Sequence, residues 1–264
     1  MVRTRKRAFR LSTLPGMLII FLQLGLLLHP LGLSAQRCVA DSLAVSQLPA
    51  GSVDSSGNKF CHTADSIQSY PDRVRFDSRQ FTVPAIFMGT GIAMDLTNGI
   101  KNSQLTFHDN HLGGFHSAAD NILLYVPAAL PYGMDLLGIR SKTDIANRTA
   151  ILIKAEILVT ASGYLLKHTV HEWRPDRSNQ YSFPSGHSLQ VFATATMLSE
   201  EYRDRFKWMP YVAYGLATGV GLLRLANNRH YVGDVLFGAG LGILSMKLAY
   251  WTHHYKWHKN HPFK

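Results

Sequence analysis

Apolar residues recur at helical spacing from about Gln80 onward, in segments that are separated by short polar turns. No run of alternating β-branched residues competes with this pattern. The pattern predicts an all-α fold, a helical bundle over residues 80–264. The helices that it predicts cover residues 121–137, 147–173, 185–202, 209–225 and 233–251.

The two segments before residue 80 have a different character. Residues 36–79 are rich in Ser, Asp and Gly and show little periodicity, which predicts a loop-rich lead-in. Residues 1–35 begin with basic side chains, continue with an apolar stretch and end on a small residue, Ala35. This order is typical of a signal peptide that is cut before Gln36, and an uncleaved N-terminal anchor is the alternative. We therefore expect an exported protein, in the periplasm or at the periplasmic face of the membrane.

Cys38 and Cys61 are the only two cysteines of the chain. Two cysteines are too few for a disulfide scaffold. In an oxidising compartment they could form one disulfide that closes the N-terminal segment, and two unrelated thiols are the alternative.

The formal charge of the chain is +10, which would suit a nucleic-acid partner if the basic residues gathered in the folded part. Five of them lie in residues 1–35, which contain no acid, so the remainder carries a charge of +5. The remaining basic residues are scattered along the chain, and we expect no nucleic-acid partner. With 46% hydrophobic residues, the composition also excludes a disordered protein.

The apolar runs after residue 80 are interrupted by charged residues such as Asp95, Lys154 and Glu156. None of the runs reaches the roughly 18 residues that a membrane span requires, as expected for helices that pack on one another. The runs at 208–223 and 235–251, with the basic tail that follows, could still lie against a membrane surface. The sequence leaves membrane attachment open.

Three short stretches between residues 167 and 234 contain the candidate chemistry. In the first, Lys167 and Arg174 are seven residues apart, which would return both side chains to one face of a helix. Pro175 predicts that this helix ends at Arg174. Two cations at a helix C-terminus could bind an anion, and a solvated basic face is the alternative.

The second stretch is Ser-Phe-Pro-Ser-Gly-His at 182–187, followed by a periodic apolar run. Pro184 suits the first turn of a helix, and Ser182 or Phe183 would cap or precede that helix. The backbone amides of Ser185, Gly186 and His187 would then form a cradle for phosphate, with the His187 side chain beside it as an acid. An ordinary capped helix start is the alternative.

The third stretch runs from Arg224 to Asp234 and contains His230. On a helix, the Asp234 carboxylate would hold one imidazole nitrogen of His230 and leave the other free as a nucleophile. Arg224 could reach the same anion from the end of the preceding helix. A surface His–Asp pair is the alternative.

The three stretches follow one order on successive predicted helices, as Lys-x6-Arg-Pro, Pro-Ser-Gly-His and Arg-x5-His-x3-Asp. In this combination the sequence resembles the type 2 phosphatidic acid phosphatase superfamily, which also includes bacterial class A acid phosphatases and vanadium haloperoxidases. The motifs cover residues 167–234, and the resemblance in fold covers about residues 120–251. Within the superfamily, the segments 120–127 and 225–234 are similar to exported bacterial lipid-phosphate phosphatases, including lipid A phosphatases.

The resemblance implies a phosphatase that works through a phosphohistidine. His230 would attack phosphorus with Asp234 orienting it, and His187, protonated at the start, would protonate the leaving oxygen and later activate water. Cationic side chains and backbone amides would hold the phosphoryl oxygens, so no metal or other cofactor is expected. The implied phosphate-binding set is Lys167, Arg174, Ser185, Gly186 and Arg224.

One position departs from the family pattern, because the third motif usually begins Ser-Arg and here Leu223 precedes the arginine. We expect this change to tune activity rather than to abolish it. Asp120 is expected to cap the helix that follows it. His108, His111 and His116 are expected in a polar loop without the spacing of a metal site.

Three functions fit these residues. The first is hydrolysis of a phosphate monoester or diphosphate of a membrane lipid, such as lipid A, undecaprenyl diphosphate or phosphatidic acid. The second is a soluble, broad-specificity periplasmic acid phosphatase that acts on small phosphomonoesters. The third is a vanadium-dependent haloperoxidase, with vanadate in the same anion pocket. The sequence favours the first.

Overall fold

The computed structural model describes residues 77–254. Within the described range every regular element is helical and no strand occurs, which confirms the expected all-α fold. The expected signal peptide, the lead-in up to residue 76 and the Cys38–Cys61 pair lie outside the described residues. The helical elements are η1 (Ser78–Phe81), α2 (Thr82–Asp95), α3 (Asn98–His111), α4 (Ala119–Leu123), α5 (Val126–Leu136), α6 (Ile145–Val170), α7 (Gly186–Tyr202), α8 (Met209–Ala226) and α9 (Val232–Trp251).

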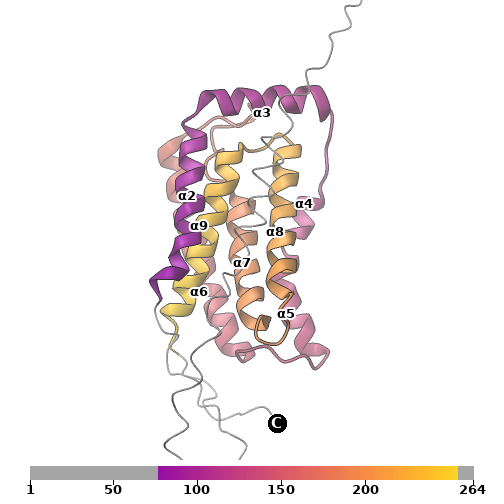
Figure 1. Cartoon of the computed structure of the whole chain (residues 1–264), viewed down its shortest axis with the longest axis vertical. Helices are drawn as coiled ribbons and strands as arrows, with labels where there is room; N and C mark the ends of the chain where they lie inside the picture. Colours follow the sequence, from indigo (N-terminus) through magenta and orange to yellow (C-terminus); the bar gives the residue numbers. More distant parts are fainter. Residues whose placement is uncertain (1–76, 255–264) are drawn as a thin grey trace, which may run out of the picture. The chain divides into compact units, whose positions relative to one another are not determined.

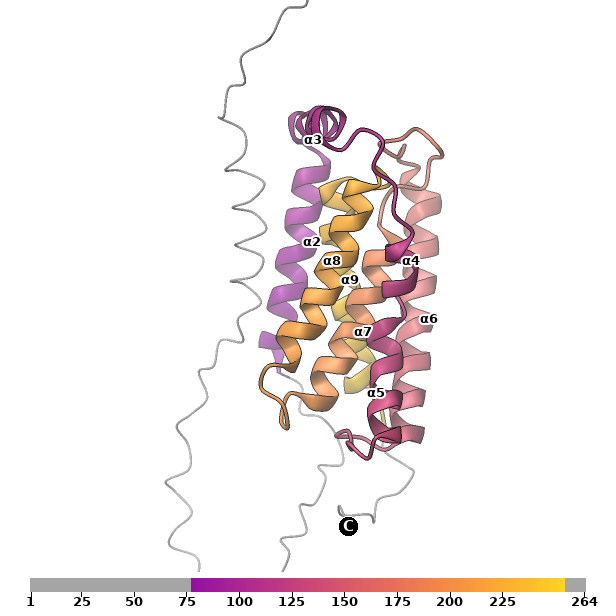
Figure 2. The same cartoon turned by 90° about the vertical axis from the view of Figure 1, so that its right-hand side faces the viewer.

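The long helices α2, α6, α7, α8 and α9 run side by side along the long axis of the bundle, and α3 lies across one end (Figures 1 and 2). Helix α9 packs against α2, α7 and α6, and most of its residues are buried. Helices α4 and α5 pack along α8 and α7. The arrangement places α9 inside the bundle, with its N-terminus near the end that α3 covers.

The hydrophobic core joins α6, α7 and α9. Ile151 and Ala155 of α6 meet Leu189 and Met197 of α7 and Met246 of α9, and all five are essentially excluded from solvent. Burial of each large apolar side chain stabilises the fold by about 1.5–3 kcal/mol. This packing fixes the two helices whose first turns carry the second and third motifs.

Helix α9 approaches its neighbours through glycines. An added Cβ atom on Gly242 would lie 2.1 Å from the carbonyl oxygen of Leu189 in α7. Toward α2, a Cβ atom on Gly240 would lie 2.7 Å from the carbonyl oxygen of Pro84. Neither separation leaves room for a methyl group, so α9 contacts both neighbours at backbone distance.

The expected helices at 185–202, 209–225 and 233–251 are confirmed to within one residue at each end, as α7, α8 and α9. The single helix expected at 121–137 is wrong, because the chain forms α4 and α5 there, separated at Leu124 and Tyr125. Pro127 in the first turn of α5 has no amide hydrogen, so it cannot continue the hydrogen bonding of α4.

The sequence pattern did not single out α2 and α3 as helices. Helix α3 is largely polar, which weakens its apolar periodicity. His108 and His111 lie on α3 rather than in the expected loop, and only His116 lies in the connection that follows it.

Within residues 77–254, two helices, α6 and α9, are long and apolar enough to cross a membrane by length and composition. The expectation that no segment reaches that length is therefore wrong. Lys154 and Glu156 interrupt the apolar sequence of α6, but they do not remove its overall apolar character. The apolar stretch of α9 is 78% buried inside the fold, whereas the apolar stretch of α6 is 22% buried. Helix α6 instead exposes Ile153, Ile157 and Leu165.

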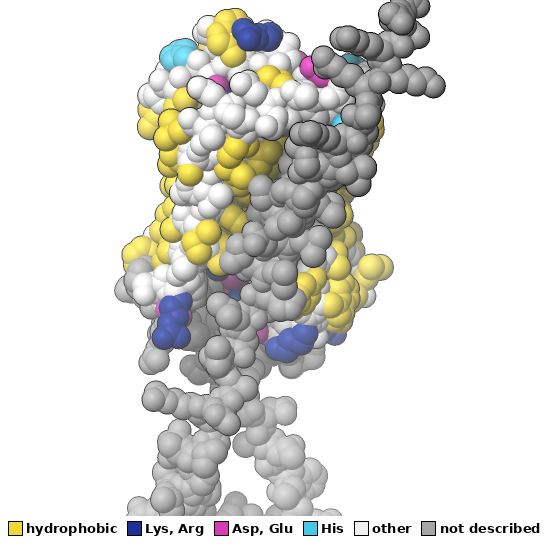
Figure 3. Space-filling view, turned by 45° about the horizontal axis from the view of Figure 1, so that its top comes forward, with side chains coloured by type: hydrophobic (Ala, Val, Ile, Leu, Met, Phe, Trp, Pro, Cys, Tyr) yellow, Lys and Arg dark blue, Asp and Glu magenta, His cyan; other side chains and the backbone are white. Residues whose placement is uncertain are grey.

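The surface in Figure 3 carries hydrophobic side chains over much of its flank, whereas the Lys and Arg side chains in view lie near its two ends. The tail that could contact a membrane begins with a buried residue: His253 Nε2 lies 2.8 Å from Asn147 Oδ1. Residues 255–264 lie outside the described part. The described surface suited to lipid is the exposed side of α6 at Ile153, Ile157 and Leu165, which we call the apolar flank, and not His253.

Candidate active site

The first motif is divided between a helix and a loop. Helix α6 ends at Val170, and His171 takes a left-handed conformation with φ of 50°. Arg174 therefore follows the helix instead of ending it, and it does not share a helical face with Lys167 as the spacing predicted. Lys167 Nζ donates to the carbonyl oxygens of Tyr181 and Pro184, at 2.9 and 2.7 Å, which holds it against the loop before α7.

The second motif forms the start of α7. Ser185 is the N-cap residue, and its Oγ accepts from the Ser188 amide at 3.4 Å. Ser182 and Phe183 precede the helix and do not cap it, which was one of the two expected outcomes, whereas the expected place of Pro184 in the first turn is wrong because Pro184 precedes the N-cap residue. The Ser185 amide donates to the backbone oxygen of Asp234 at 3.1 Å, so it is not available to phosphate as predicted. The amides of Gly186 and His187 remain candidates, because first-turn amides lack intrahelical partners.

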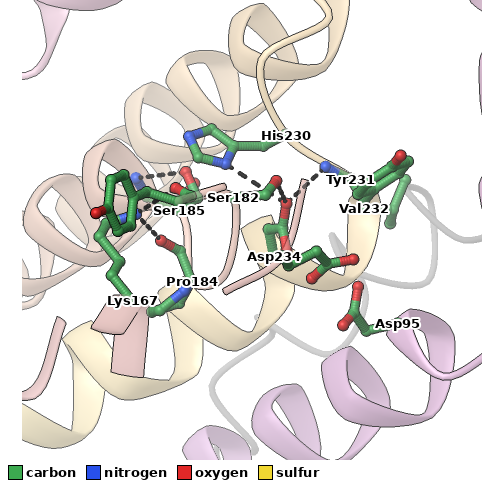
Figure 4. Close-up of polar contacts among 12 residues, drawn as sticks. Asp95, Lys167, Ser182, Pro184, Ser185, His230, Tyr231, Val232 and Asp234 are labelled. Carbon is green, nitrogen blue, oxygen red and sulfur yellow. Dashed lines mark hydrogen bonds and ion pairs between the residues drawn. The ribbon is translucent and has the colours of Figure 1, made fainter. Parts of the chain in front are cut away.

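The third motif brings His230 and Asp234 together in a different way from the predicted helical pair. His230 precedes α9, Tyr231 is the N-cap residue and Asp234 lies in the first turn. Asp234 Oδ2 accepts from Ser182 Oγ at 2.5 Å and from the Tyr231 amide at 2.8 Å, and it lies 3.5 Å from His230 Nδ1 (Figure 4). Both side chains of the pair are almost fully buried. Because Nδ1 faces the carboxylate, Nε2 is the nitrogen left for attack.

Arg224 lies in the last turn of α8 and is held by Asp120 of α4. The Arg224 guanidinium donates to Asp120 Oδ2 at 2.7 Å, and Asn227 Nδ2 approaches the same oxygen at 3.3 Å. Burial raises the pKa of the Asp120 carboxyl, but the bond to Arg224, the charges of Arg224 and His187 and the Asn121 amide together outweigh burial, and the pKa is lowered. Asp120 is thus the buried partner of a candidate phosphate ligand, and its expected role as a helix cap is wrong.

His187 lies half-buried in the first turn of α7, with its Nε2 2.8 Å from Asn121 Oδ1. Burial and the charge of Arg224 lower the pKa of His187 to about 4. Burial also lowers the pKa of His230 to about 4, although Asp234 acts in the opposite direction. Both imidazoles are therefore neutral at pH 7, which contradicts the expectation that His187 is protonated at the start.

The three predicted cations act on one region. The charges of Lys167 and Arg224 both lower the pKa of His230, and those of Arg174 and Arg224 both lower the pKa of His187. The Nε atoms of both arginines are buried without a hydrogen-bond partner in the described part of the chain. A tetrahedral oxyanion would satisfy these donors and the surrounding positive charge.

A cluster of carboxylates lies behind Asp234. Oxygens of Asp95, Glu172 and Asp234 lie within 4.8 Å of one another, a geometry that could hold a cation. The Lys101 ammonium already pairs with Asp95 at 3.0 Å and with Glu172, so the chain supplies a positive charge there itself. Burial, with the charge of Asp234, raises the pKa of Glu172 to about 8.

Sequence reasoning missed several supporting contacts of this site. The bond from Ser182 to Asp234, the contact of Asn121 with His187 and the bonds of Gln104 to the backbone around His230 join residues far apart in the chain. A single polar residue in a helical segment carries no signal of such a partner. Asp120 and Asn121 lie within the segment 120–127, and Ser182 lies within the second motif, so the resemblance to the family pointed to these regions without indicating their contacts.

The motifs and their geometry agree with a comparison against protein families. Residues 148–258 match the family model described as the PAP2 superfamily. This region contains every predicted site residue, and it matches the family of the type 2 phosphatidic acid phosphatases. The family inferred from the three motifs is thereby confirmed.

Two relatives of assigned function match parts of the chain. The lipid A 1-phosphatase of Porphyromonas gingivalis is 33% identical over 142 residues, which cover 53% of this chain and 32% of that protein. The phosphatidylglycerophosphatase B of Bacillus subtilis is 34% identical over 104 residues, which cover 33% of this chain and 51% of that protein. The chain therefore matches about a third to a half of the length of these relatives.

Two solved structures are similar to the chain. The crystal structure of Aquifex aeolicus LpxE has a TM-score of 0.42 and 22% identity, over 55% of this chain and 93% of that one. A transmembrane PAP2 type phosphatidylglycerolphosphate phosphatase from Bacillus subtilis has a TM-score of 0.41 and 21% identity, over 63% of this chain and 93% of that one.

Proposed function

We propose that the protein is a metal-independent phosphatase that hydrolyses a phosphate monoester or diphosphate of a membrane lipid through a phosphohistidine at His230. The observation that carries the proposal is the buried His230 imidazole, whose Nδ1 lies 3.5 Å from Asp234 Oδ2 and whose pKa is lowered by burial and by the charges of Arg224 and Lys167. A neutral imidazole with one nitrogen engaged is a nucleophile, and nearby cations stabilise the charge on phosphoryl oxygens. The residues that would carry out this reaction all lie in 148–258, the region that matches the family.

In the first step, the lone pair of His230 Nε2 forms a bond to phosphorus while the bond from phosphorus to the ester oxygen breaks. His187 gives its proton to that oxygen, which leaves as an alcohol. In the second step, a water oxygen attacks phosphorus, His187 takes a proton from the water, and the bond from phosphorus to His230 breaks. Inorganic phosphate leaves and both imidazoles return to their starting states.

The proton that His187 donates must arrive with the substrate or be taken up when the substrate binds, because His187 alone is neutral at pH 7. A phosphoryl dianion beside His187 favours the charged imidazole, since an opposite charge within about 4–6 Å raises the pKa of a histidine. A phosphate monoester also has a second pKa of about 6, so its monoanion can bring this proton. Both routes give the same protonated complex.

The lipid substrate is supported by two observations. Helix α6 exposes large apolar side chains, including Ile157 and Leu165, whereas its motif end carries Lys167 beside the α7 loop. Both relatives are named as phosphatases of lipid phosphates. We infer an exported, membrane-associated enzyme whose apolar flank meets lipid while the phosphate reaches the cationic site.

A substrate panel tests this function. Purified protein in detergent is given lipid A, undecaprenyl diphosphate, phosphatidic acid and p-nitrophenyl phosphate, and phosphate release is measured with and without EDTA. We expect hydrolysis of at least one lipid phosphate with a higher kcat/KM than that of p-nitrophenyl phosphate, and no effect of EDTA. Preference for the small ester would favour the broad-specificity acid phosphatase. Bromide oxidation by peroxide on addition of vanadate, without phosphate release, would favour the haloperoxidase.

The phosphohistidine is tested by His230→Ala. Acid quenching of wild type with a ³²P-labelled substrate is expected to trap an acid-labile phosphoenzyme, and His230→Ala is expected to lose both this label and all turnover. His168→Ala is the control, because among the described residues the His168 ring bonds to the Tyr164 carbonyl on its own helix and stacks on Tyr164 and on Tyr181 in the loop before α7. Label retained in His230→Ala would refute the assigned nucleophile.

A further inference from the structure

Helix α3 lies across the end of the bundle where the three motifs meet, and it lies outside the residues that match the family (Figure 1). Lys101, Gln104 and His108 share one face of this helix, because residues three and four apart are neighbours on a helical surface. Each of these side chains reaches a different segment that carries a candidate site residue. Helix α3 therefore connects parts of the site that are distant in the sequence.

The two outer side chains of this face contact the first and third motifs. Lys101 pairs with Glu172, two residues before Arg174, and its ammonium also lies 5.0 Å from the ring centroid of Tyr231. At the other end, His108 Nε2 lies 3.1 Å from the carbonyl oxygen of Ala226, in the turn that contains Arg224. All three contacts are to residues near Arg174, Arg224 or His230 in the chain, and none is to the side chains of Arg174 or Arg224 themselves.

The central side chain, Gln104, contacts the nucleophile segment twice. Its Nε2 donates to the carbonyl oxygen of His230 at 3.0 Å, and its Oε1 accepts from the Val232 amide at 3.0 Å. Gln104 is 4% exposed, so neither bond competes with bulk water. One planar amide thus holds the backbone on both sides of Tyr231, and this backbone sets the direction of the His230 imidazole.

We propose that Gln104 is a positioning residue for the His230 nucleophile, with α3 as the brace that carries it. The inference rests on the proposed function, since it assigns Gln104 to the attack of His230 on phosphorus. No bond from Gln104 to the proposed phosphate-binding side chains occurs in the described residues. Gln104 therefore acts on the alignment of the nucleophile and not on the affinity for the oxyanion.

The test compares Gln104→Met and Gln104→Glu with wild type. Gln104→Met keeps the length of the side chain and removes both hydrogen bonds, so we expect kcat to fall about 10- to 100-fold, the scale of a nucleophile misplaced by about 1 Å. The inhibition constant of inorganic phosphate is expected to stay within about twofold of wild type, because the oxyanion ligands are untouched.

Gln104→Glu keeps the shape and the acceptor but regains a donor only when its carboxyl is protonated. Its kcat relative to wild type is therefore expected to rise as the pH is lowered, a rescue that a merely structural role would not produce. Gln190→Met is the matched control, since Gln190 lies on α7 and bonds only to Glu156 at 3.3 Å. Its kcat is expected to equal that of wild type.

Wild-type kcat in Gln104→Met would overturn the inference, as would a loss of kcat matched by an equal loss of phosphate affinity. If Gln104→Met does not fold, Gln104→Glu decides, and a kcat ratio to wild type that is independent of pH overturns the inference. Each of these results leaves the proposed function standing, because wild type still turns over. A wild type that hydrolyses no phosphate ester would instead overturn the proposed function and this inference with it.

Discussion

At the scale of single residues, the Asp234 carboxylate both joins the loop before α7 to the start of α9 and orients the His230 imidazole. One of its oxygens accepts from the Ser182 hydroxyl and the Tyr231 amide, and it also faces His230 Nδ1. A carboxylate held by two donors keeps its position without help from the histidine. His230 can therefore become charged or phosphorylated while the orienting group stays in place.

The assignment of His187 as the acid predicts a dependence on the leaving group. His187→Ala is expected to lower kcat for an alkyl phosphate by about 10²–10⁴, the usual contribution of a general acid. The loss for p-nitrophenyl phosphate is expected to be much smaller, because nitrophenolate leaves without a proton. Steady-state kinetics of both substrates measure the two ratios, and equal slowing would remove His187 from this role.

The lowered pKa of His230 predicts where activity is lost in acid. His230 attacks only when neutral, and its pKa in the free enzyme is about 4. As the pH falls through this value the imidazole gains a proton, so kcat/KM is expected to decrease below about pH 4 and not at the pH of about 6.5 of an ordinary histidine. A kcat/KM profile on p-nitrophenyl phosphate measures it, with circular dichroism at each pH as the control for folding. Because a phosphate ester itself titrates at about pH 6, the profile is corrected for the ionisation of p-nitrophenyl phosphate, and an acid limb at pH 6–7 that persists after this correction would contradict the buried, neutral nucleophile.

At the scale of elements, the sequence predicted the helices that the core fixes and missed the contacts that join them. The apolar repeats of α7, α8 and α9 reflect burial in one core, so their bounds follow from the pattern. The loop at Arg174 could not be predicted in the same way, because the left-handed residue that ends α6 is a histidine rather than a glycine. The buried bond between Arg224 and Asp120 joins residues more than a hundred positions apart, which no local pattern records.

The glycine contacts of α9 predict a sharp difference between two equivalent substitutions. A Cβ atom on Gly242 would lie 2.1 Å from the Leu189 carbonyl oxygen, so Gly242→Ala is expected to cost at least about 1–3 kcal/mol through overpacking. Gly215 lies exposed on α8 with nothing within 4 Å of an added Cβ, so Gly215→Ala is expected to stabilise the fold by about 0.5–1 kcal/mol. Chemical unfolding followed by circular dichroism measures both, and equal effects would refute the close contact.

At the scale of the whole molecule, the described part combines a polar, cationic end with an apolar flank. The motif residues gather near the end covered by α3, while α6 exposes apolar side chains along its length. A lipid phosphate has the same division between a charged head and apolar chains. The proposed lipid substrate would match this division, with its phosphate at the cationic end and its chains along the apolar side of α6.

The apolar flank predicts a substrate-dependent effect of surface changes. The double variant Ile157→Ser and Leu165→Ser replaces two side chains that are each 62% exposed, so it is expected to leave the fold intact. Hydrolysis of phosphatidic acid in vesicles is expected to fall several-fold because less apolar surface meets the bilayer, whereas hydrolysis of p-nitrophenyl phosphate is expected to stay unchanged. Both rates are measured on the same preparation, and an equal loss on both substrates would point to a folding defect instead.

Asp234 lies in the first turn of α9. Further along the same helix, Gly240 and Gly242 allow α9 to pack closely against α2 and α7. Because α9 contacts both neighbours at backbone distance, its N-terminal turn cannot become disordered while the rest of the helix stays packed. We therefore expect gradual warming to leave turnover intact up to the temperature at which the bundle melts, with no earlier inactivation confined to the catalytic pair.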